Sequence, residues 1–263
     1  MPFAYDVGLG TAYERRAVWE RLERWFGGRV ASAAEGPVDG FAGLPGLHLL
    51  PLALSGTHVT VVVTDAGAAE RVRAVYDRAG LADRLTALVG GELPARRFDL
   101  VLSFNALAQT ERWREYLGDQ WRRASELVVS VSHRYTYGRA LAGLVRTLRR
   151  APPSRLYRSD SASPRQLERA FAELGGRLRE HAWVDCPWWP DLFVEGGSTL
   201  RQELFGRDSG RARFVYDAGS LPLPGARPAD LERALARHPS FESSRLAPLF
   251  AHHRFYRVVR PGR

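Results

Sequence analysis

The sequence predicts an α/β protein with a mostly parallel sheet. Short runs of apolar and β-branched residues alternate with amphipathic stretches of helical period along most of the chain. Strands that alternate with helices favour parallel pairing through right-handed crossovers. The 263 residues and the apolar fraction of 45% suit one large domain with an ample core, which argues against global disorder.

The first third of the chain predicts a helix, a strand, a glycine-rich turn, a second helix and a second strand. Thr11 is a suitable N-cap with Glu14 at the capping-box position, and Gly27-Gly28 ends the helix. The strand from Val30 to Ala34 ends at Glu35. The segments that follow are the turn with Gly36, Gly40, Gly43 and Gly46, the helix Leu47 to Leu54, and the strand His58 to Thr64, which ends at Asp65.

The same alternation continues to the end of the chain. The predicted helices are Ala68 to Ala79, Glu111 to Ser125, Tyr137 to Arg150 and Pro164 to Leu174, the last with Ser163 as N-cap. The predicted strands are Leu85 to Val89, Phe98 to Phe104, Glu126 to Val131, Arg179 to Val184 and His252 to Val259. We interpret the chain as one domain, with an N-terminal helix or lid (1–29), a core (30–187), an insertion (188–249), partly helical near 229–236, and a closing strand (250–263).

A glycine-rich turn after one strand and a carboxylate after the next form a pattern that suits a nucleoside. The turn lets the backbone approach a ligand, and the carboxylate of Asp65 can accept hydrogen bonds from ribose hydroxyls. The nicotinamide-binding spacing GxGxxG is absent, so a dehydrogenase is a weaker alternative.

Together with the phrase FDLVLSFNAL at the fourth strand, these features resemble class I S-adenosylmethionine-dependent methyltransferases. The resemblance implies a Rossmann-like, seven-stranded, mostly parallel sheet with helices on both faces, a reversed final strand and an insertion before it. It implies S-adenosylmethionine as cofactor and methyl transfer to a small-molecule acceptor, at oxygen, nitrogen or carbon. The residues implied in cofactor binding are Glu35, Gly36 and Gly40 around the methionine and sugar, Asp65 at the ribose, Glu92 near the adenine, and Ser103 and Asn105 below the sulfonium.

The glycine-rich turn departs from the family pattern acid-x-Gly-x-Gly-x-Gly. Its glycines stand one, five and eight residues after Glu35, and the interval from Glu35 to Asp65 is long. A catalytically inactive methyltransferase-like subunit that binds a protein partner is therefore an alternative. An RNA methyltransferase is a further one, prompted by a pI of 10.3, although Asn105-Ala-Leu-Ala replaces the motif expected for amino methylation of a base.

Aromatic and imidazole side chains follow the fifth strand, where an acceptor would bind. We predict His133 and Tyr135 as catalytic residues, with His133 as a general base, and Tyr137, Trp188, Trp189 and Asp191 as substrate-binding residues. The plainer interpretations are a capping or surface histidine and two tryptophans that anchor the insertion. His252 and His253 should point to opposite sides of a strand and Cys186 is the lone cysteine, so no metal site is predicted.

The formal charge of +9 comes from arginine alone, because the sequence contains no lysine. The arginines are spread along several helices beside glutamates, which is typical of solvated helix faces and makes nucleic acid an unfavoured partner. The sequence has no signal-peptide pattern and no apolar run of membrane-spanning length, so we expect a cytoplasmic protein without a membrane partner. A homodimer or a protein partner remains open.

Overall fold

The computed structural model describes residues 6–7, 9–38, 44–108, 110–133, 135–137, 140, 144, 147–148, 162–188, 193–194, 198–199, 215–216, 222–226 and 228–262. Seven strands form one sheet in the order β4-β3-β2-β5-β6-β11-β7. These strands are β2 (Ser32–Val38), β3 (His58–Val63), β4 (Leu85–Val89), β5 (Phe98–Phe104), β6 (Ala124–Ser132), β7 (Arg177–Val184) and β11 (His253–Val259).

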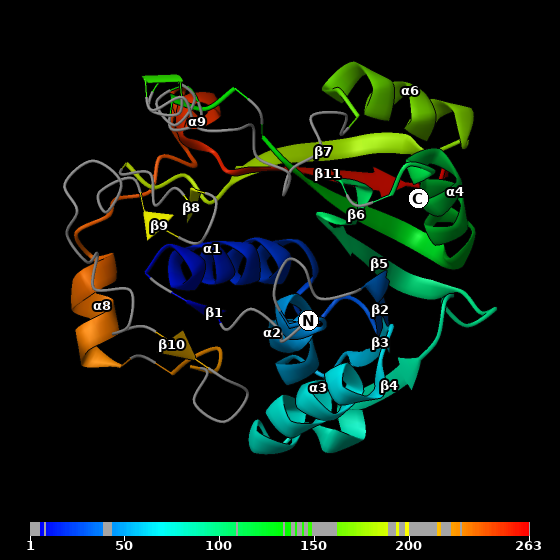
Figure 1. Cartoon of the computed structure of the whole chain (residues 1–263). Coiled ribbons are helices and arrows are strands. Elements are labelled where there is room, and N and C mark those ends of the chain that lie inside the picture. Colours follow the sequence, from blue (N-terminus) through cyan, green and yellow to red (C-terminus); the bar gives the residue numbers. More distant parts are fainter. Residues whose placement is uncertain are drawn as a thin grey trace.

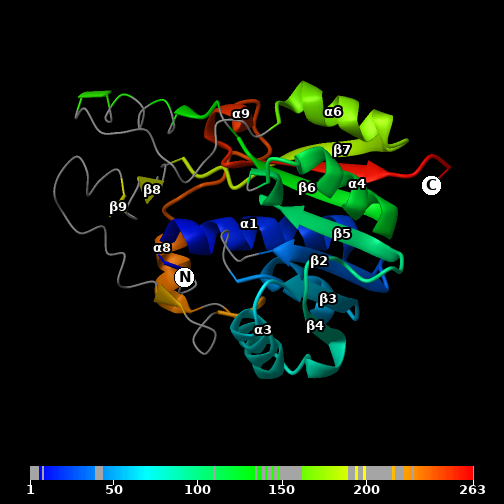
Figure 2. The same cartoon turned by 45° about the vertical axis from the view of Figure 1, so that its right-hand side comes forward.

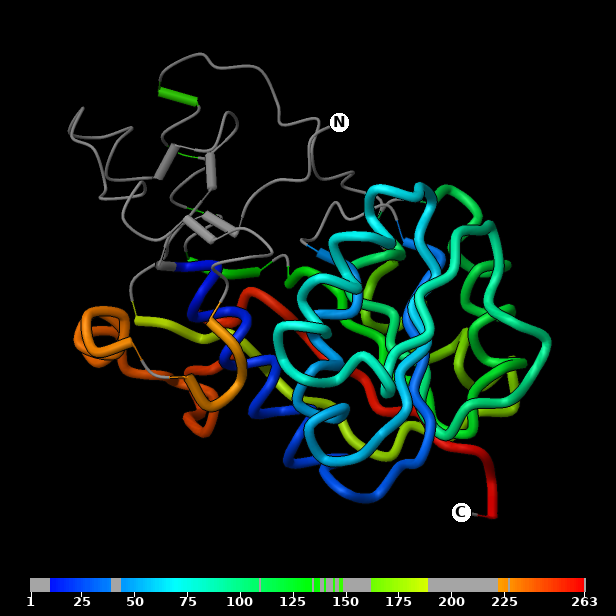
Figure 3. The backbone as a smooth tube through the Cα atoms, turned by 90° about the horizontal axis from the view of Figure 1, so that it is seen from below, coloured from blue at the N-terminus to red at the C-terminus, as the bar shows by residue number. Residues whose placement is uncertain are grey.

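Strands β2 to β6 pair in parallel, and β11 is antiparallel to both β6 and β7. The predicted mostly parallel, seven-stranded sheet with a reversed last strand is therefore confirmed. Figure 3 shows the chain running from helix α8 (Ala229–Leu235) through β11, in red, to the carboxyl terminus on the opposite side of the molecule.

Helices cover both faces of the sheet (Figures 1 and 2). One face is covered by α1 (Leu9–Phe26), the short helices η1 (Leu47–Leu49) and α2 (Leu50–Leu54), and α3 (Ala66–Arg78). The other is covered by α4 (Trp113–Arg123) and α6 (Pro164–Glu173). Successive side chains of β5 point to opposite faces of the sheet. Leu100 and Leu102 therefore pack in the α1 layer, and Val101 packs in the α4 layer.

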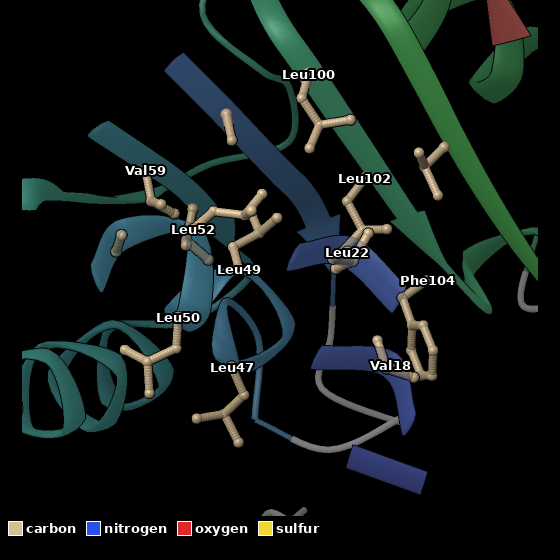
Figure 4. Packing of buried hydrophobic residues seen from close by; sticks show 14 of the residues in the cluster. Val18, Leu22, Leu47, Leu49, Leu50, Leu52, Val59, Leu100, Leu102 and Phe104 are labelled. Atoms are coloured by element: carbon tan, nitrogen blue, oxygen red, sulfur yellow. The ribbon is translucent and has the colours of Figure 1, made fainter. Parts of the chain in front are cut away.

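The larger core lies beneath α1 and α2. Figure 4 shows Val18 and Leu22 of α1 beside Leu102 and Phe104 of β5, with the leucines of η1 and α2 next to them. All of these side chains are almost fully buried. Helix α1 therefore packs as an integral part of the core.

The elements of the insertion lie beyond the end of the sheet at which β11 begins (Figures 1 and 2). They include α8, α9 (Ala247–Phe250), the strand pair β8 (Phe193–Val194) and β9 (Ser198–Thr199), and β10 (Val215–Tyr216), which pairs with β1 (Asp6–Val7). Two short 3-10 helices, η2 (Ala82–Arg84) and η3 (Ala106–Ala108), connect elements of the core. The predicted division into lid, core, insertion and closing strand stays a prediction.

Several predicted element boundaries were wrong. Helix α1 begins at Leu9, so Thr11 lies inside the helix and is not its N-cap. Strand β2 continues to Val38, because the chain keeps pairing with β3 beyond Glu35. Helix α4 ends at Arg123 and passes directly into β6. The cap of α6 is confirmed: Ser163 and Gln166 form a capping box. Most of the helix predicted from Tyr137 to Arg150 lies outside the described residues.

Candidate functional site

The buried carboxylate of Glu35 holds the two ends of the glycine-rich turn together. Its Oε2 accepts a hydrogen bond from the backbone N–H of Gly46 at 2.8 Å, and the Tyr76 hydroxyl donates to the carbonyl of Gly46 at 2.9 Å. Burial raises the pKa of Glu35 to about 7, although the Gly46 N–H favours the charged form. Gly40, in the middle of the turn, lies outside the described residues.

Gly36 occupies a position where no side chain fits. Its φ is +117°, and an added Cβ would lie 2.2 Å from the carbonyl oxygen of Val62 on β3. Its own carbonyl accepts a hydrogen bond from Nε2 of the buried Gln120 at 3.1 Å. Gly36 is thus required for the close approach of β2 to β3, whatever the turn binds.

Asp65 stands at the tip of β3 with its side chain exposed. Its Oδ1 accepts the backbone N–H of Ala68 at 2.8 Å, so Asp65 is the N-cap of α3. Glu92 follows β4, has a mostly exposed side chain, and forms an ion pair with Arg123 of α4 at 3.3 Å. Parallel pairing brings the carboxyl ends of β3, β2 and β5 to one edge, whereas Arg123, the partner of Glu92, directly precedes the amino end of β6.

Ser103 and Asn105 mark the end of β5. Ser103 is fully buried. Asn105 has a φ of +52°, a conformation that residues other than glycine adopt rarely and often at functional sites. Its backbone N–H donates to the carbonyl of Ser130 at 3.1 Å, and its Nδ2 lies 3.4 Å from Nδ1 of His253. Strand β11 therefore contributes directly to this edge of the sheet.

Among the described acceptor-side residues, the rings of His133 and Tyr135 lie 5.9 Å apart, and Tyr137 contacts Trp188. The His133 ring is buried against Trp183, with ring centroids 4.6 Å apart, whereas Tyr135 is largely exposed. The Tyr137 hydroxyl donates to the carbonyl of Trp188, and burial raises the pKa of Tyr137 to about 12.

Trp188 is bound within the insertion. Its Nε1 donates to the carbonyl of Arg237 at 2.7 Å, and its ring stacks on that of His238. These contacts fit the anchoring interpretation of Trp188. Trp189 and Asp191 lie outside the described residues.

The structure also brings together a group that the sequence did not indicate. Ligand atoms of Glu14, Asp185 and His253 lie within 4.8 Å of one another, from α1, the end of β7 and the start of β11. Asp185, like Asn105, is a non-glycine residue with positive φ, at +59°. Both adjacent histidines contact this group: Nδ1 of His252 lies 2.7 Å from Asp185 Oδ2, and Nε2 of His253 lies 3.3 Å from Glu14 Oε2.

Burial and neighbouring charges shift the pKa values of side chains in and next to this group. Burial raises the pKa of Glu14, but the charge and hydrogen bond of His253, together with the charges of His48 and His252, outweigh it, so the net effect is a lowered pKa. Burial lowers the pKa of His48 to about 4, so this ring is neutral at pH 7, with its centroid 3.9 Å from that of Phe104. The only sequence signals for the group were the adjacent histidines and a glutamate in the first helix.

No known family model matches the sequence, and no curated protein sequence is similar to it. Solved structures do share its fold. One is a protein from Galdieria sulphuraria, provisionally named a sarcosine dimethylglycine methyltransferase (TM-score 0.53, 13% identity, 94% of this chain and 85% of that chain covered).

Two further solved structures are similar to the same extent. The StiE O-methyltransferase has a TM-score of 0.53 and 14% identity, with 94% of this chain and 75% of that chain covered. The [4+2]-cyclase SpnF has a TM-score of 0.53 and 16% identity, with 94% and 80% covered. At such identities the likeness concerns the fold alone, and one fold can support several activities.

Proposed function

We propose that this chain, which has the fold of class I S-adenosylmethionine-dependent methyltransferases, transfers a methyl group from that cofactor to a small-molecule acceptor. The observation that carries the proposal is the hydrogen bond from Gly46 N–H to the buried Glu35. It closes the glycine-rich turn at the carboxyl end of β2, next to the tip of β3 where Asp65 stands. This edge of an open α/β sheet is where such folds bind nucleosides.

In this proposal, each residue at the edge has a separate role. Glu35, Gly36 and Gly40 border the methionine and sugar, the exposed carboxylate of Asp65 accepts the ribose hydroxyls, and Asn105 borders the sulfonium. Methyl transfer is an in-line displacement, so positioning of the two reactants supplies most of the rate acceleration. The acceptor atom is oxygen, nitrogen or carbon, with His133 or Tyr135 as the group that takes its proton.

A second candidate function is a methyltransferase-like subunit that binds a protein partner without catalysis. The length of β2 favours this second candidate. The strand continues through Gly36 to Val38, whereas in the family pattern the chain has already turned toward the cofactor at this point. The two candidates differ in one property that can be measured directly, which is affinity for the cofactor.

The test is calorimetric titration with S-adenosylhomocysteine of the wild type and of Asp65→Asn. Asparagine preserves the N-cap of α3, so the variant should fold, but it removes the charge that strengthens hydrogen bonds from ribose. We expect micromolar binding to the wild type and binding about ten-fold or more weaker in the variant, from the loss of a charge-assisted hydrogen bond.

Asp83→Asn is the matched control, because Asp83 is an exposed aspartate beside Arg84, away from this edge. It should bind like the wild type. Absence of binding in a folded wild-type protein would reject the enzyme and favour the partner-binding subunit. Equal binding by Asp65→Asn and wild type would reject the role of Asp65.

A further inference from the structure

Three side chains from distant parts of the sequence meet at the end of the sheet where β11 begins. Glu14 comes from α1, Asp185 follows β7 and His253 is the first residue of β11. Each offers one ligand atom, and these atoms lie within 4.8 Å of one another. A separation of this size allows three ligands to contact one cation after small side-chain movements.

The imidazole of His253 points into this group without a well-aligned donor or acceptor. The residue is 4% exposed, and its Nε2 makes no hydrogen bond of good geometry among the described residues, although Glu14 Oε2 lies 3.3 Å away. A buried ring nitrogen in this state is an available ligand, since neutral imidazole coordinates metal through one nitrogen.

His253 and Asp185 each have a further polar partner outside the group of three, as metal ligands usually do. The other ring nitrogen of His253, Nδ1, lies 3.4 Å from the Asn105 amide, which can present its oxygen after a flip. The Asp185 carboxylate is held at 2.7 Å by Nδ1 of His252. Such outer partners fix the orientation of ligating histidines and carboxylates.

The balance of charge also favours a cation. One arginine beside this group, Arg21, pairs with Glu242 at 3.2 Å, and Glu242 in turn accepts the backbone N–H of Asp185. Glu14 and Asp185 are themselves paired with imidazoles, which carry charge only when protonated. A bound dication would neutralise both carboxylates.

We propose that Glu14, Asp185 and His253 bind one divalent transition-metal ion. Two carboxylate oxygens and one imidazole nitrogen suit ions such as Zn²⁺ and Mn²⁺ better than Ca²⁺, which prefers six to eight oxygen ligands. Three protein ligands leave at least one position open, and Glu14, whose side chain is 28% exposed, lies on the solvent side. The site adjoins Asn105 at the end of β5. It goes beyond the proposed methyl transfer and does not depend on it.

The test is titration of chelator-treated full-length protein with Zn²⁺ alone, followed by calorimetry in the presence of a competing chelator. We expect one high-affinity site per chain in the wild type. Glu14→Gln should weaken it at least ten-fold, because a charged ligand is lost from a partly exposed position where folding should be preserved. His252→Asn should weaken it about 10- to 100-fold, through the outer partner of Asp185.

Two control variants test whether the loss of any glutamate on α1, or of any histidine, weakens Zn²⁺ binding. Glu20→Gln removes an exposed glutamate from the same helix, and His58→Gln removes a histidine bonded to Thr86 on β4. Both should bind Zn²⁺ like the wild type. Binding unchanged in Glu14→Gln, or no binding to a wild-type protein that is folded by circular dichroism, would overturn the proposal. S-adenosylhomocysteine titration of the metal-free protein tests the methyltransferase proposal separately.

Discussion

Burial of the Glu35 side chain makes the free energy of unfolding depend on pH. Its carboxylate is 3% exposed and accepts the Gly46 N–H, and burial raises its pKa from 4.5 to about 7. The folded state therefore binds this proton more tightly than the unfolded chain does. The resulting stabilisation is complete below pH 4.5 and is lost as the pH rises through about 7.

We expect the free energy of unfolding of the wild type to fall, relative to Glu35→Gln, by about 3 kcal/mol between pH 4.5 and pH 8. Glutamine retains an oxygen that can accept the Gly46 N–H but does not titrate. Urea unfolding of both proteins across this range measures the difference, and groups that titrate equally in both cancel. Parallel pH profiles would show that Glu35 has an ordinary pKa.

At the scale of elements, the approach of β2 to β3 depends on a single residue without a side chain. The register between the two strands shifts between Glu35 and Val38, and Gly36 lies at this irregularity against the backbone of Val62. Bulges of this kind re-aim the end of a strand, and they often lie next to active sites.

We expect Gly36→Ala to destabilise the protein by more than about 3 kcal/mol, because a steric clash with Val62 adds to the strain of positive φ. Gly56→Ala is the matched control: its φ is +97°, but an added Cβ would meet nothing within 4 Å. It should cost only about 1–2 kcal/mol. Chemical denaturation compares the two variants, and equal losses would disprove the close approach.

Helix α1, near the start of the chain, contacts segments near its end. Arg16 pairs with Glu232 of α8, Arg21 pairs with Glu242 ahead of α9, and Glu14 faces His253 of β11. These contacts attach the described part of the insertion to a helix that is itself packed on the sheet. We therefore expect α1, the sheet and these segments to unfold together.

No helix among the described residues is long and apolar enough to cross a membrane.

The Arg21–Glu242 pair should contribute measurably to this joint stability, since the two side chains are only 10% and 16% exposed. Arg21→Met leaves a buried carboxylate without its counter-charge and should cost about 3–5 kcal/mol. A double-mutant cycle with Glu242→Gln should give a coupling of about 1–3 kcal/mol.

The exposed pair Arg112–Glu115 is the reference for this cycle, with side chains 81% and 70% exposed. Its coupling should be below about 0.5 kcal/mol. Similar coupling energies for both pairs would mean that Arg21 does not hold the insertion against α1.

Local signals in the sequence predicted the parallel strands of the sheet, and the family resemblance added its seven-stranded form with a reversed last strand. Strands such as His58–Val63 are runs of apolar or β-branched residues, and some helix boundaries follow caps and glycines, as at Ser163 and Gly80. The carboxyl ends of parallel strands must share one edge, so the positions of Asp65 and Asn105 followed from the ends of their strands, whereas Glu35 lies inside β2, three residues before its end. Their functional roles stay predictions, as do those of Gly40, Trp189 and Asp191.

Which side chains of distant segments meet could not be predicted from the sequence, because it depends on how the elements pack. Glu14 and His253 are far apart in sequence, and their contact depends on α1 packing across the sheet beside the reversed strand β11. The extension of β2 to Val38 and the pairing of Glu92 with Arg123 likewise depend on neighbours from other elements. Local periodicity determines which elements form, whereas contacts between elements depend on packing, register and burial of the whole chain, which no short segment encodes.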